Sequence, residues 1–231
     1  MTDTTASRST LSLGVIGNAA VAALVDERAS IVWMCAPRLD GDPVFCRLLR
    51  GDADDPRDGA WSVRVEGLAK TEQSYVRNTA IIETLFTDED GNVLRVRDFA
   101  PRFKASGRIF RPLTITRIVE PVKGTPRVSM ALRPLHGYGA HTPETTRGSS
   151  HVRFLLGDQV LRLTTDAPVE FLLSETTFVA DRPYAFILGP DERLDGAPLA
   201  VAHKLLEETH SYWVDWVRYL SLPVDWQDVV I

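Results

Sequence analysis

Cysteine is scarce in this sequence, which also has neither a long apolar run nor a basic cluster. Only Cys35 and Cys46 occur among its 231 residues, which excludes a framework of several disulfide bonds and leaves two free thiols or one bridge. No apolar stretch reaches the ~20 residues that a membrane-spanning helix needs. With a net charge of −5 and no cluster of Lys and Arg, the surface does not suit nucleic acid. We therefore expect a cytoplasmic protein that binds neither membrane nor nucleic acid.

The apolar segment 11–24 could instead belong to a secretory signal peptide, because it follows Arg8 and resembles the apolar core of such a peptide. However, Asn18 interrupts this segment, and Asp3 offsets its single positive charge. The segment also leads directly into a strand-like stretch that ends at Cys35. We therefore expect residues 11–24 to form strands of the folded domain.

Familiar catalytic and cofactor motifs are absent. The sequence contains no GxxxxGK[ST], GxGxxG, GxSxG or HExxH, so it assigns no catalytic residue and no cofactor. His203, Glu207 and His210 fall on one helix face at spacings of four and three, which would suit a metal ion. No second ligand cluster points at them, so we favour solvated polar side chains and expect no metal site. The acidic segment 51–58 lacks the final Glu of a calcium loop and predicts a solvated loop.

Short strands separated by turn residues dominate the chain up to residue 196. Segment 61–66 alternates apolar and polar residues, and segments 80–87 and 92–99 flank a turn that ends at Gly91. Further strands are expected at 13–17, 20–26, 31–35, 113–119, 127–132, 151–156, 159–164, 169–173, 176–180 and 184–188. Many short strands with turns every ~8–12 residues and no helices between them are typical of a sandwich. We predict an all-β domain, a large antiparallel two-sheet β-sandwich, over residues 1–196.

One amphipathic helix is expected next, at residues 197–222. Pro198 suits its first turn, and Pro223 lies just beyond its end. Its apolar residues recur near a 3.6-residue period and include Trp213 and Trp216. Aromatic rings can stack on sugars, but an apolar stripe of this kind is more typical of a packing surface. We predict a linker helix whose Trp213 and Trp216 dock onto a neighbouring domain that begins at residues 223–231.

The segment between residues 33 and 45 carries the candidate binding residues. A strand ends, Pro37 bends the chain, and the loop presents Arg38, Asp40 and Asp42. Arginine and carboxylate groups hydrogen-bond sugar hydroxyls well. The same composition also suits a rigid turn in which Arg38 pairs with Asp40. Both interpretations stay open at this point.

An ordered series of motifs resembles the amino-terminal region of bacterial proteins in glycoside hydrolase family 15, the glucoamylase and trehalase type. The series covers essentially the whole chain: Ile16-Gly17-Asn18, Ala22-Ala23-Leu24-Val25, Ile31-x-Trp33-x-Cys35-x-Pro37-Arg38-x-Asp40, Asn78-Thr79-Ala80-Ile81-Ile82-Glu83-Thr84, Asp98-Phe99-Ala100-Pro101, Arg133-Pro134-x-x-x-Tyr138-Gly139 and Tyr212-Trp213-x-x-Trp216. Asn18 stands where the family usually has Asp, and residues 27–30 replace an Asp-Gly-Ser turn. Leu39 replaces Phe and Gly41-Asp42 replaces Ser-Pro, so departures also fall in the candidate loop.

The resemblance implies a two-domain enzyme in which the sandwich and linker helix precede a catalytic (α/α)6 barrel. Such enzymes hydrolyse α-glucosidic bonds with inversion, using two barrel glutamates ~6.5–9.5 Å apart. We therefore expect a non-catalytic domain that braces the barrel, with Arg38, Asp40 and Asp42 bordering its cleft. The parent enzyme's substrate would be an α-glucosidic oligosaccharide or trehalose. The alternative is a stand-alone carbohydrate-binding or protein-interaction module.

Overall fold

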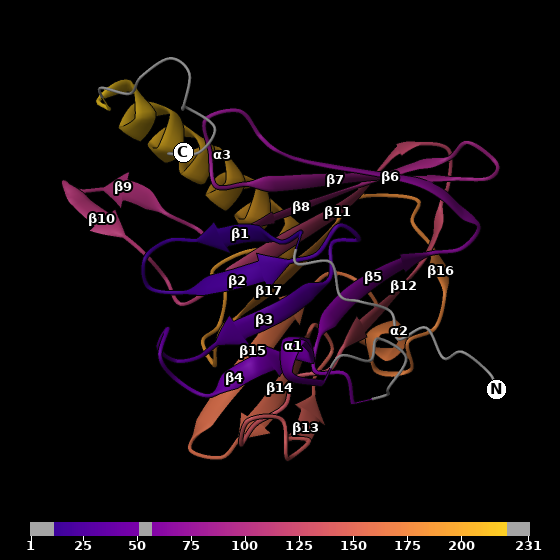
Figure 1. The fold of residues 1–231 in the computed structure, drawn as a ribbon, viewed down its shortest axis with the longest axis horizontal. Coiled ribbons are helices and arrows are strands. Elements are labelled where there is room, and N and C mark those ends of the chain that lie inside the picture. The colour runs from indigo at the N-terminus through magenta and orange to yellow at the C-terminus, as the bar shows by residue number, and fades with distance from the viewer. Residues whose placement is uncertain (1–11, 51–56, 221–231) are drawn as a thin grey trace, which may run out of the picture.

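The computed structural model describes residues 12–50 and 57–220, and these form two facing β-sheets with a long helix against them (Figure 1). Every strand pair within the two sheets is antiparallel. The predicted all-β, two-sheet antiparallel sandwich followed by a helix is therefore confirmed.

The first sheet has seven strands within the described residues. Its order is β1 (Gly14–Gly17), β2 (Ala22–Val25), β3 (Ile31–Cys35), β5 (Trp61–Val65), β12 (Arg127–Leu132) and β16 (Phe178–Val179), with β4 (Pro43–Cys46) paired to β3. A short helix, α1 (Arg47–Arg50), follows β4. Because β1 to β4 are consecutive along the chain, this half of the sheet is built from local connections.

The second sheet has eight strands in the part of the chain that the structure describes. Its order is β13 (Glu144–Arg147), β14 (His151–Leu156), β15 (Gln159–Thr165), β17 (Tyr184–Pro190), β11 (Ile115–Lys123), β8 (Val93–Phe99), β7 (Ile82–Asp88) and β6 (Leu68–Tyr75). A hairpin of β9 (Phe103–Ala105) and β10 (Arg108–Phe110) projects from one side (Figure 1). The predicted β7–β8 hairpin is present, and Gly91 takes the positive φ of +77° that its turn requires.

Buried and more exposed residues alternate along the strands, and this alternation explains how the two sheets pack together. β7 alternates buried and half-buried residues from end to end, so one of its faces enters the core. Its Ile82 and Phe86 join side chains of the first sheet in a single apolar cluster between the sheets. The largest fully buried apolar side chains of this cluster are Trp61, Phe45, Phe86, Phe186, Ile16, Ile31, Met34, Ile82 and Leu94.

An ion pair of Arg117 and Asp98 lies inside this core. Neither side chain has any exposed surface, and the guanidinium donates to both carboxylate oxygens at 2.7 and 3.0 Å. Arg117 also donates to the carbonyl oxygens of Trp61 and Ala29, and its guanidinium lies 4.6 Å from the centre of the Trp61 ring. Arg117 and Asp98 both belong to the second sheet, whereas Trp61 lies on β5 and Ala29 in the turn between β2 and β3. The bonds from Arg117 to these two carbonyls therefore tie the two sheets together.

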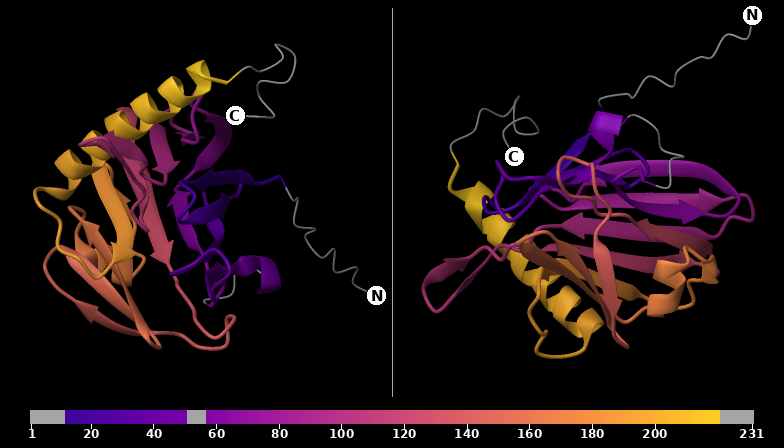
Figure 2. Two further views of the ribbon diagram at one scale, coloured as in Figure 1. Left: turned by 90° about the vertical axis from the view of Figure 1, so that its left-hand side faces the viewer. Right: turned by 90° about the horizontal axis from the view of Figure 1, so that it is seen from below.

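Helix α3 (Pro198–Arg218) crosses the outer face of the second sheet (Figure 2). Its buried Ala202 packs with Ile81, Phe99, Ile118 and Ile187 in a second apolar layer. The helix observed within the described residues lies inside the predicted linker segment 197–222. The predicted domain boundaries stay a prediction, as does the start of a barrel at 223–231, a segment that lies outside the described residues.

Three local predictions were wrong. Segment 169–173 is helix α2 (Val169–Leu173), not a strand, and α1 is a second short helix between strands. The expected loop 37–45 ends early, because residues 43–46 form β4 beside β3. Asp58, expected in a solvated loop, is buried, while residues 51–56 lie outside the described residues. Residues 12–24 contribute β1 and part of β2, as expected.

Candidate cleft loop and docking surfaces

The candidate loop of residues 37–42 connects β3 to β4 at one end of the first sheet. Within it, Arg38 and Asp40 form a paired contact, with Nε to Oδ1 at 2.8 Å and Nη2 to Oδ2 at 3.0 Å. Their side chains are 77% and 72% exposed, so both project into solvent. The hydrogen bond from Arg38 lowers the pKa of the Asp40 carboxyl, which keeps the carboxylate charged. The local pairing expected of a turn is therefore present.

Asp42 has a different partner, far away in the sequence. Its carboxylate accepts hydrogen bonds from the backbone N–H groups of Gly137 and Tyr138, the latter at 2.7 Å. That second loop is closed by reciprocal backbone hydrogen bonds of 3.0 Å between His136 and His141. Asp42 thus joins two loops into one composite edge rather than grouping with Arg38 and Asp40.

Tyr138 stands exposed on this composite edge. Its φ of +55° is a left-handed conformation that a non-glycine residue adopts at some cost, and its side chain is 69% exposed. The Gln159 side chain fixes the start of the neighbouring loop by donating to the Ala36 carbonyl at 3.0 Å. The edge is therefore held in place by contacts from three separate parts of the chain.

The two cysteines are both buried, and no disulfide bond joins them. Cys35 ends β3, directly before the candidate loop. Burial raises the pKa of the Cys35 thiol, and the nearby carboxylates of Asp42 and Asp40 raise it further, against a hydrogen bond with Trp33. A thiol in this state is a poor nucleophile.

The aromatic end of α3 is partly packed within the chain. Tyr212 and Trp216 each contact Trp213 edge to face, with ring centres 5.4 and 5.5 Å from that of Trp213. The guanidinium of Arg102 lies 4.9 Å from the Tyr212 ring and 5.4 Å from the Trp213 ring. Trp213 is half-buried by these contacts, whereas Trp216 is 37% exposed. Trp216 is therefore the more available of the two for a neighbouring domain.

Sequence comparison now adds to this geometry. Residues 5–171 match the family described as trehalase-like, N-terminal. The chain belongs to this family of trehalase-like amino-terminal domains. The match includes both loops of the composite edge and ends before α3.

Two curated relatives of this trehalase-like domain come from Sulfolobus acidocaldarius. Trehalase 1 is 31% identical over 161 residues, which cover 68% of this chain and 25% of that protein. Trehalase 2 is 25% identical over 129 residues, which cover 56% of this chain and 19% of that protein. The chain thus spans a quarter or less of the length of these relatives. No solved structure matches it.

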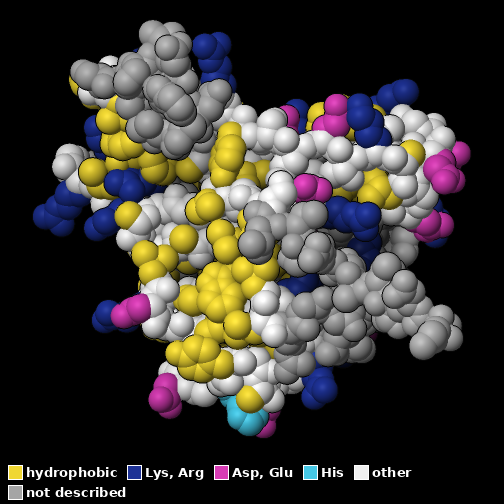
Figure 3. Space-filling view, viewed as in Figure 1, with side chains coloured by type: hydrophobic (Ala, Val, Ile, Leu, Met, Phe, Trp, Pro, Cys, Tyr) yellow, Lys and Arg dark blue, Asp and Glu magenta, His cyan; other side chains and the backbone are white. Residues whose placement is uncertain are grey.

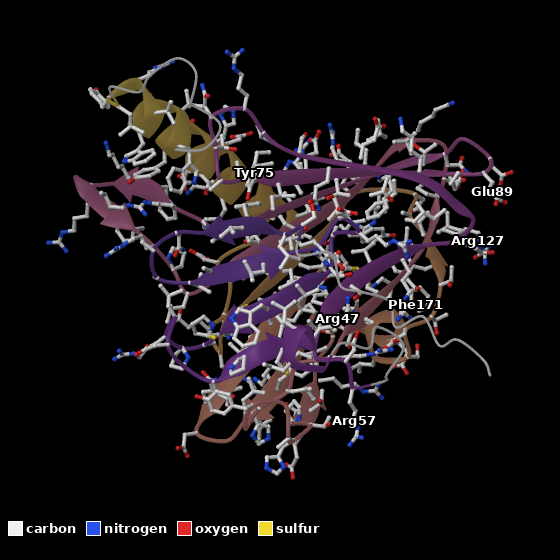
Figure 4. The ribbon with its side chains drawn as sticks, viewed as in Figure 1. Arg47, Arg57, Tyr75, Glu89, Arg127 and Phe171 are labelled. Atoms are coloured by element: carbon white, nitrogen blue, oxygen red, sulfur yellow. The ribbon has the colours of Figure 1, made fainter. Side chains whose placement is uncertain are left out.

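The first sheet of the trehalase-like domain also carries a polar network that sequence patterns did not single out. Arg47 donates to the buried carboxylate of Asp58 and to the Ser62 hydroxyl at 2.7 Å (Figure 4). Arg133 lies 3.5 Å from the second oxygen of Asp58 and binds Glu175 at 2.6 Å. Its members come from four distant segments, so no short-range spacing could have revealed them.

The metal candidate does not assemble into a site. His203 is half-buried, while Glu207 and His210 are exposed on α3. Within residues 12–50 and 57–220, no three His, Cys, Asp or Glu side chains are grouped closely enough to hold a metal ion. None of the helices described in the trehalase-like domain is both long and apolar enough to cross a membrane.

Proposed function

We propose that this chain is the non-catalytic amino-terminal domain of a hydrolase of the glycoside hydrolase family 15 type, acting on α-glucosidic bonds in the cytoplasm. The observation that carries the proposal is its membership of the trehalase-like amino-terminal family. Its two curated relatives are named trehalases, and most of their length lies outside the matched region. Trehalose or an α-glucosidic oligosaccharide is the proposed substrate of the parent enzyme. The family match favours this function over a stand-alone binding module.

The carboxylates inside the domain support a non-catalytic role. Asp98 and Asp58 are buried and bind Arg117 and Arg47 respectively. Inverting hydrolysis needs two carboxyls on opposite sides of a sugar, with space for a water molecule between them. A carboxylate engaged by an arginine inside a core cannot take either role. We therefore assign the catalytic pair, as part of this proposal, to the following barrel domain.

The structural part of the proposal is that α3 braces the barrel and that the candidate loop borders its cleft. Trp216 and the half-buried Trp213 offer the barrel an aromatic surface. Arg38 and Asp40 project from a loop whose neighbours are fixed by Asp42 and Gln159. A charged pair on a preorganised loop can contact sugar hydroxyls without an ordering cost.

The test of the loop is Arg38→Ala in the full-length enzyme. Loss of one charge-assisted hydrogen bond to the substrate should lower kcat/KM by about ten- to a hundred-fold. The melting temperature should stay near that of the wild type, because the Arg38–Asp40 pair is exposed. Arg127→Ala is the matched control, since Arg127 also forms an exposed pair, with Glu66, far from the loop (Figure 4).

The value of kcat/KM decides whether Arg38 borders the cleft. If Arg38→Ala and Arg127→Ala have the same kcat/KM as the wild type, Arg38 does not border the cleft. The wider proposal has its own test, since the 231-residue chain should not hydrolyse trehalose, maltose or maltooligosaccharides. Turnover that copurifies with this chain would overturn the non-catalytic assignment.

A further inference from the structure

The outward face of β1, β2 and β3 is apolar, although it lies on the outside of the sandwich. Val15 pairs with Leu24, and Leu24 pairs with Trp33, so three apolar side chains form one row across the strands. Val15 is exposed, and Leu24 and Trp33 are partly exposed. The adjacent Ile16 and Met34 point the other way, into the core between the sheets. The row therefore contributes nothing to that core.

The composition of these strands is that of strands covered on both faces. β2 (Ala22–Val25) and β3 (Ile31–Cys35) consist entirely of apolar residues. An antiparallel strand with one face in water normally alternates apolar and polar residues. β8 follows that rule, because Arg95 and Arg97 occupy its outward face. The contrast indicates that a further surface covers the outward side of β1 to β3.

The apolar region extends from the strands onto α1. We call Val15, Leu24, Trp33 and Leu49 the front apolar face; Leu49 is exposed on α1, which contacts β3. Figure 3 shows hydrophobic side chains gathered over this half of the first sheet. A polar network borders this region, because Arg47 of the same helix binds Ser62 and Asp58. Contiguous exposed apolar surface of this kind marks an interaction site.

We propose that the front apolar face is the surface on which the following barrel domain docks in the parent enzyme. This inference rests on the proposed function and names the contact surface that it requires. The occupant is a domain of the same polypeptide, because about three quarters of Trehalase 1 lies outside the region that this chain matches. A domain linked in cis needs little surface to dock, since its effective concentration is high.

The course of α3 supports this occupant. The helix begins behind the second sheet and ends on the side of the first sheet, as the left panel of Figure 2 shows. The carboxyl-terminal end of the helix therefore lies on the same side as the front apolar face. The exposed Trp216 lies near that end of α3 and extends the aromatic surface toward the docked domain.

The proposal also explains the position of the candidate loop. β3 carries Trp33 in the apolar row and leads, after Cys35, directly into residues 37–42. A domain docked on Trp33 would place the exposed Arg38 and Leu39 at the rim of its interface. The same contact would then bury an apolar face and bring a charged loop to the edge of the partner.

Hydroxyl-radical footprinting can test the surface directly. Oxidation rates at Trp33 and Leu49 would be measured in the 231-residue chain and in the full-length enzyme. Both rates should fall several-fold in the full-length enzyme. Leu173 on α2 is the internal control, because it is exposed on a different element and should react equally in both proteins.

A matched pair of substitutions gives a second test. Val15→Asp and Val179→Asp change valines that are 49% and 43% exposed on β1 and β16, the two ends of the first sheet. Both variants should leave the melting temperature of the 231-residue chain nearly unchanged. In the full-length enzyme, only Val15→Asp should restore the oxidation of Trp33 and lower kcat/KM.

The outcomes separate this inference from the function on which it rests. If Trp33 is equally reactive in both proteins while Trp216 becomes protected, the domain docks through α3 and the front apolar face is not the interface. Protection of Trp33 that grows with the concentration of the 231-residue chain assigns the face to a second copy and also overturns the inference. Trehalose hydrolysis by the 231-residue chain would instead contradict the proposed function itself.

Discussion

Replacing Arg117 with methionine should destabilise the domain strongly. Arg117 is completely buried and is the ion-pair partner of the equally buried Asp98. Removing it leaves a buried carboxylate without a counter-charge, which costs about 3–5 kcal/mol. Because a domain's total stability is about 5–15 kcal/mol, the loss would be a large fraction of it. Two carbonyl oxygens, of Trp61 and Ala29, also lose their donor.

The double variant Arg117→Met/Asp98→Leu separates the free-energy cost of the unpaired charge from the cost of the lost hydrogen bonds. It removes both ions, and replacing a buried pair with apolar side chains is often neutral. The Trp61 and Ala29 carbonyls would still lack a donor, at about 1–3 kcal/mol for each fully desolvated group. The double variant should therefore recover much, but not all, of the stability that Arg117→Met loses.

The single variant should also show a stronger pH dependence than the wild type. Burial raises the pKa of Asp98, and Arg117 opposes that rise. Without Arg117 the folded-state pKa moves further above the unfolded value of ~3.9. A raised carboxyl pKa favours the protonated folded state, so stability is lost as the pH rises through the folded-state pKa. Arg117→Met should therefore gain stability relative to the wild type as the pH falls from neutral toward ~4.

Urea unfolding followed by circular dichroism would measure these free energies. Arg127→Met is the control, because its exposed pair with Glu66 is worth less than about 1 kcal/mol. If Arg117→Met costs no more than Arg127→Met, Arg117 does not tie the sheets together. A double variant that is less stable than Arg117→Met would contradict the charge argument.

Three further predictions concern the turns that position the loops. Asp42→Ala removes the acceptor for the N–H groups of residues 137 and 138, so hydrogen exchange at these two amides, measured by nuclear magnetic resonance, should become faster. Unchanged exchange rates would contradict the role of Asp42 in joining the two loops. Gly59→Ala, at a φ of +66°, places a Cβ 2.9 Å from Cys46 Sγ and should cost about 1–3 kcal/mol in urea unfolding; a stabilised variant would contradict this packing. Burial acts to raise the pKa of Asp88, but hydrogen bonds from residues 90–92 outweigh it and lower the pKa. The stability deficit of Asp88→Asn in thermal unfolding should therefore shrink as the pH falls below ~4, and a constant deficit would refute it.

Strands with one buried face could be predicted because their alternation is visible in the sequence. β7 and β8 show this pattern, and the turn between them has the expected glycine. β6 (Leu68–Tyr75) was missed because it is an edge strand with many polar, exposed residues. With one neighbour and little buried surface, such a strand carries a weak periodic signal.

The error at α2 has a definite physical cause. A five-residue apolar run fits a buried strand and a single helical turn equally well. Within this segment only Val169 and Leu172 are buried, at the three-residue spacing of a helix. Pro168, which precedes the first helical residue, was the available signal, since proline is tolerated at helix starts.

The candidate loop makes one contact that is local in the sequence and one that is distant, and only the local contact could be predicted. The pairing of Arg38 with Asp40 spans two residues and could be anticipated from the turn composition. The contact of Asp42 with Tyr138 spans 96 residues and depends on how the whole sandwich folds. Sequence motifs indicated both segments separately, but only the folded chain shows that one carboxylate joins them.

β3 connects the core, the proposed docking surface and the candidate loop. Its Ile31 and Met34 face the core, Trp33 faces outward, and its end leads into the loop. The turn before β3 is bound by Arg117 through the Ala29 carbonyl. A domain that docks on Trp33 therefore contacts a strand whose position is fixed from the core. Because the loop follows directly after β3, a barrel domain that fails to dock on this strand also fails to meet the loop. Val15→Asp should therefore lose both contacts, and Val179→Asp should retain both.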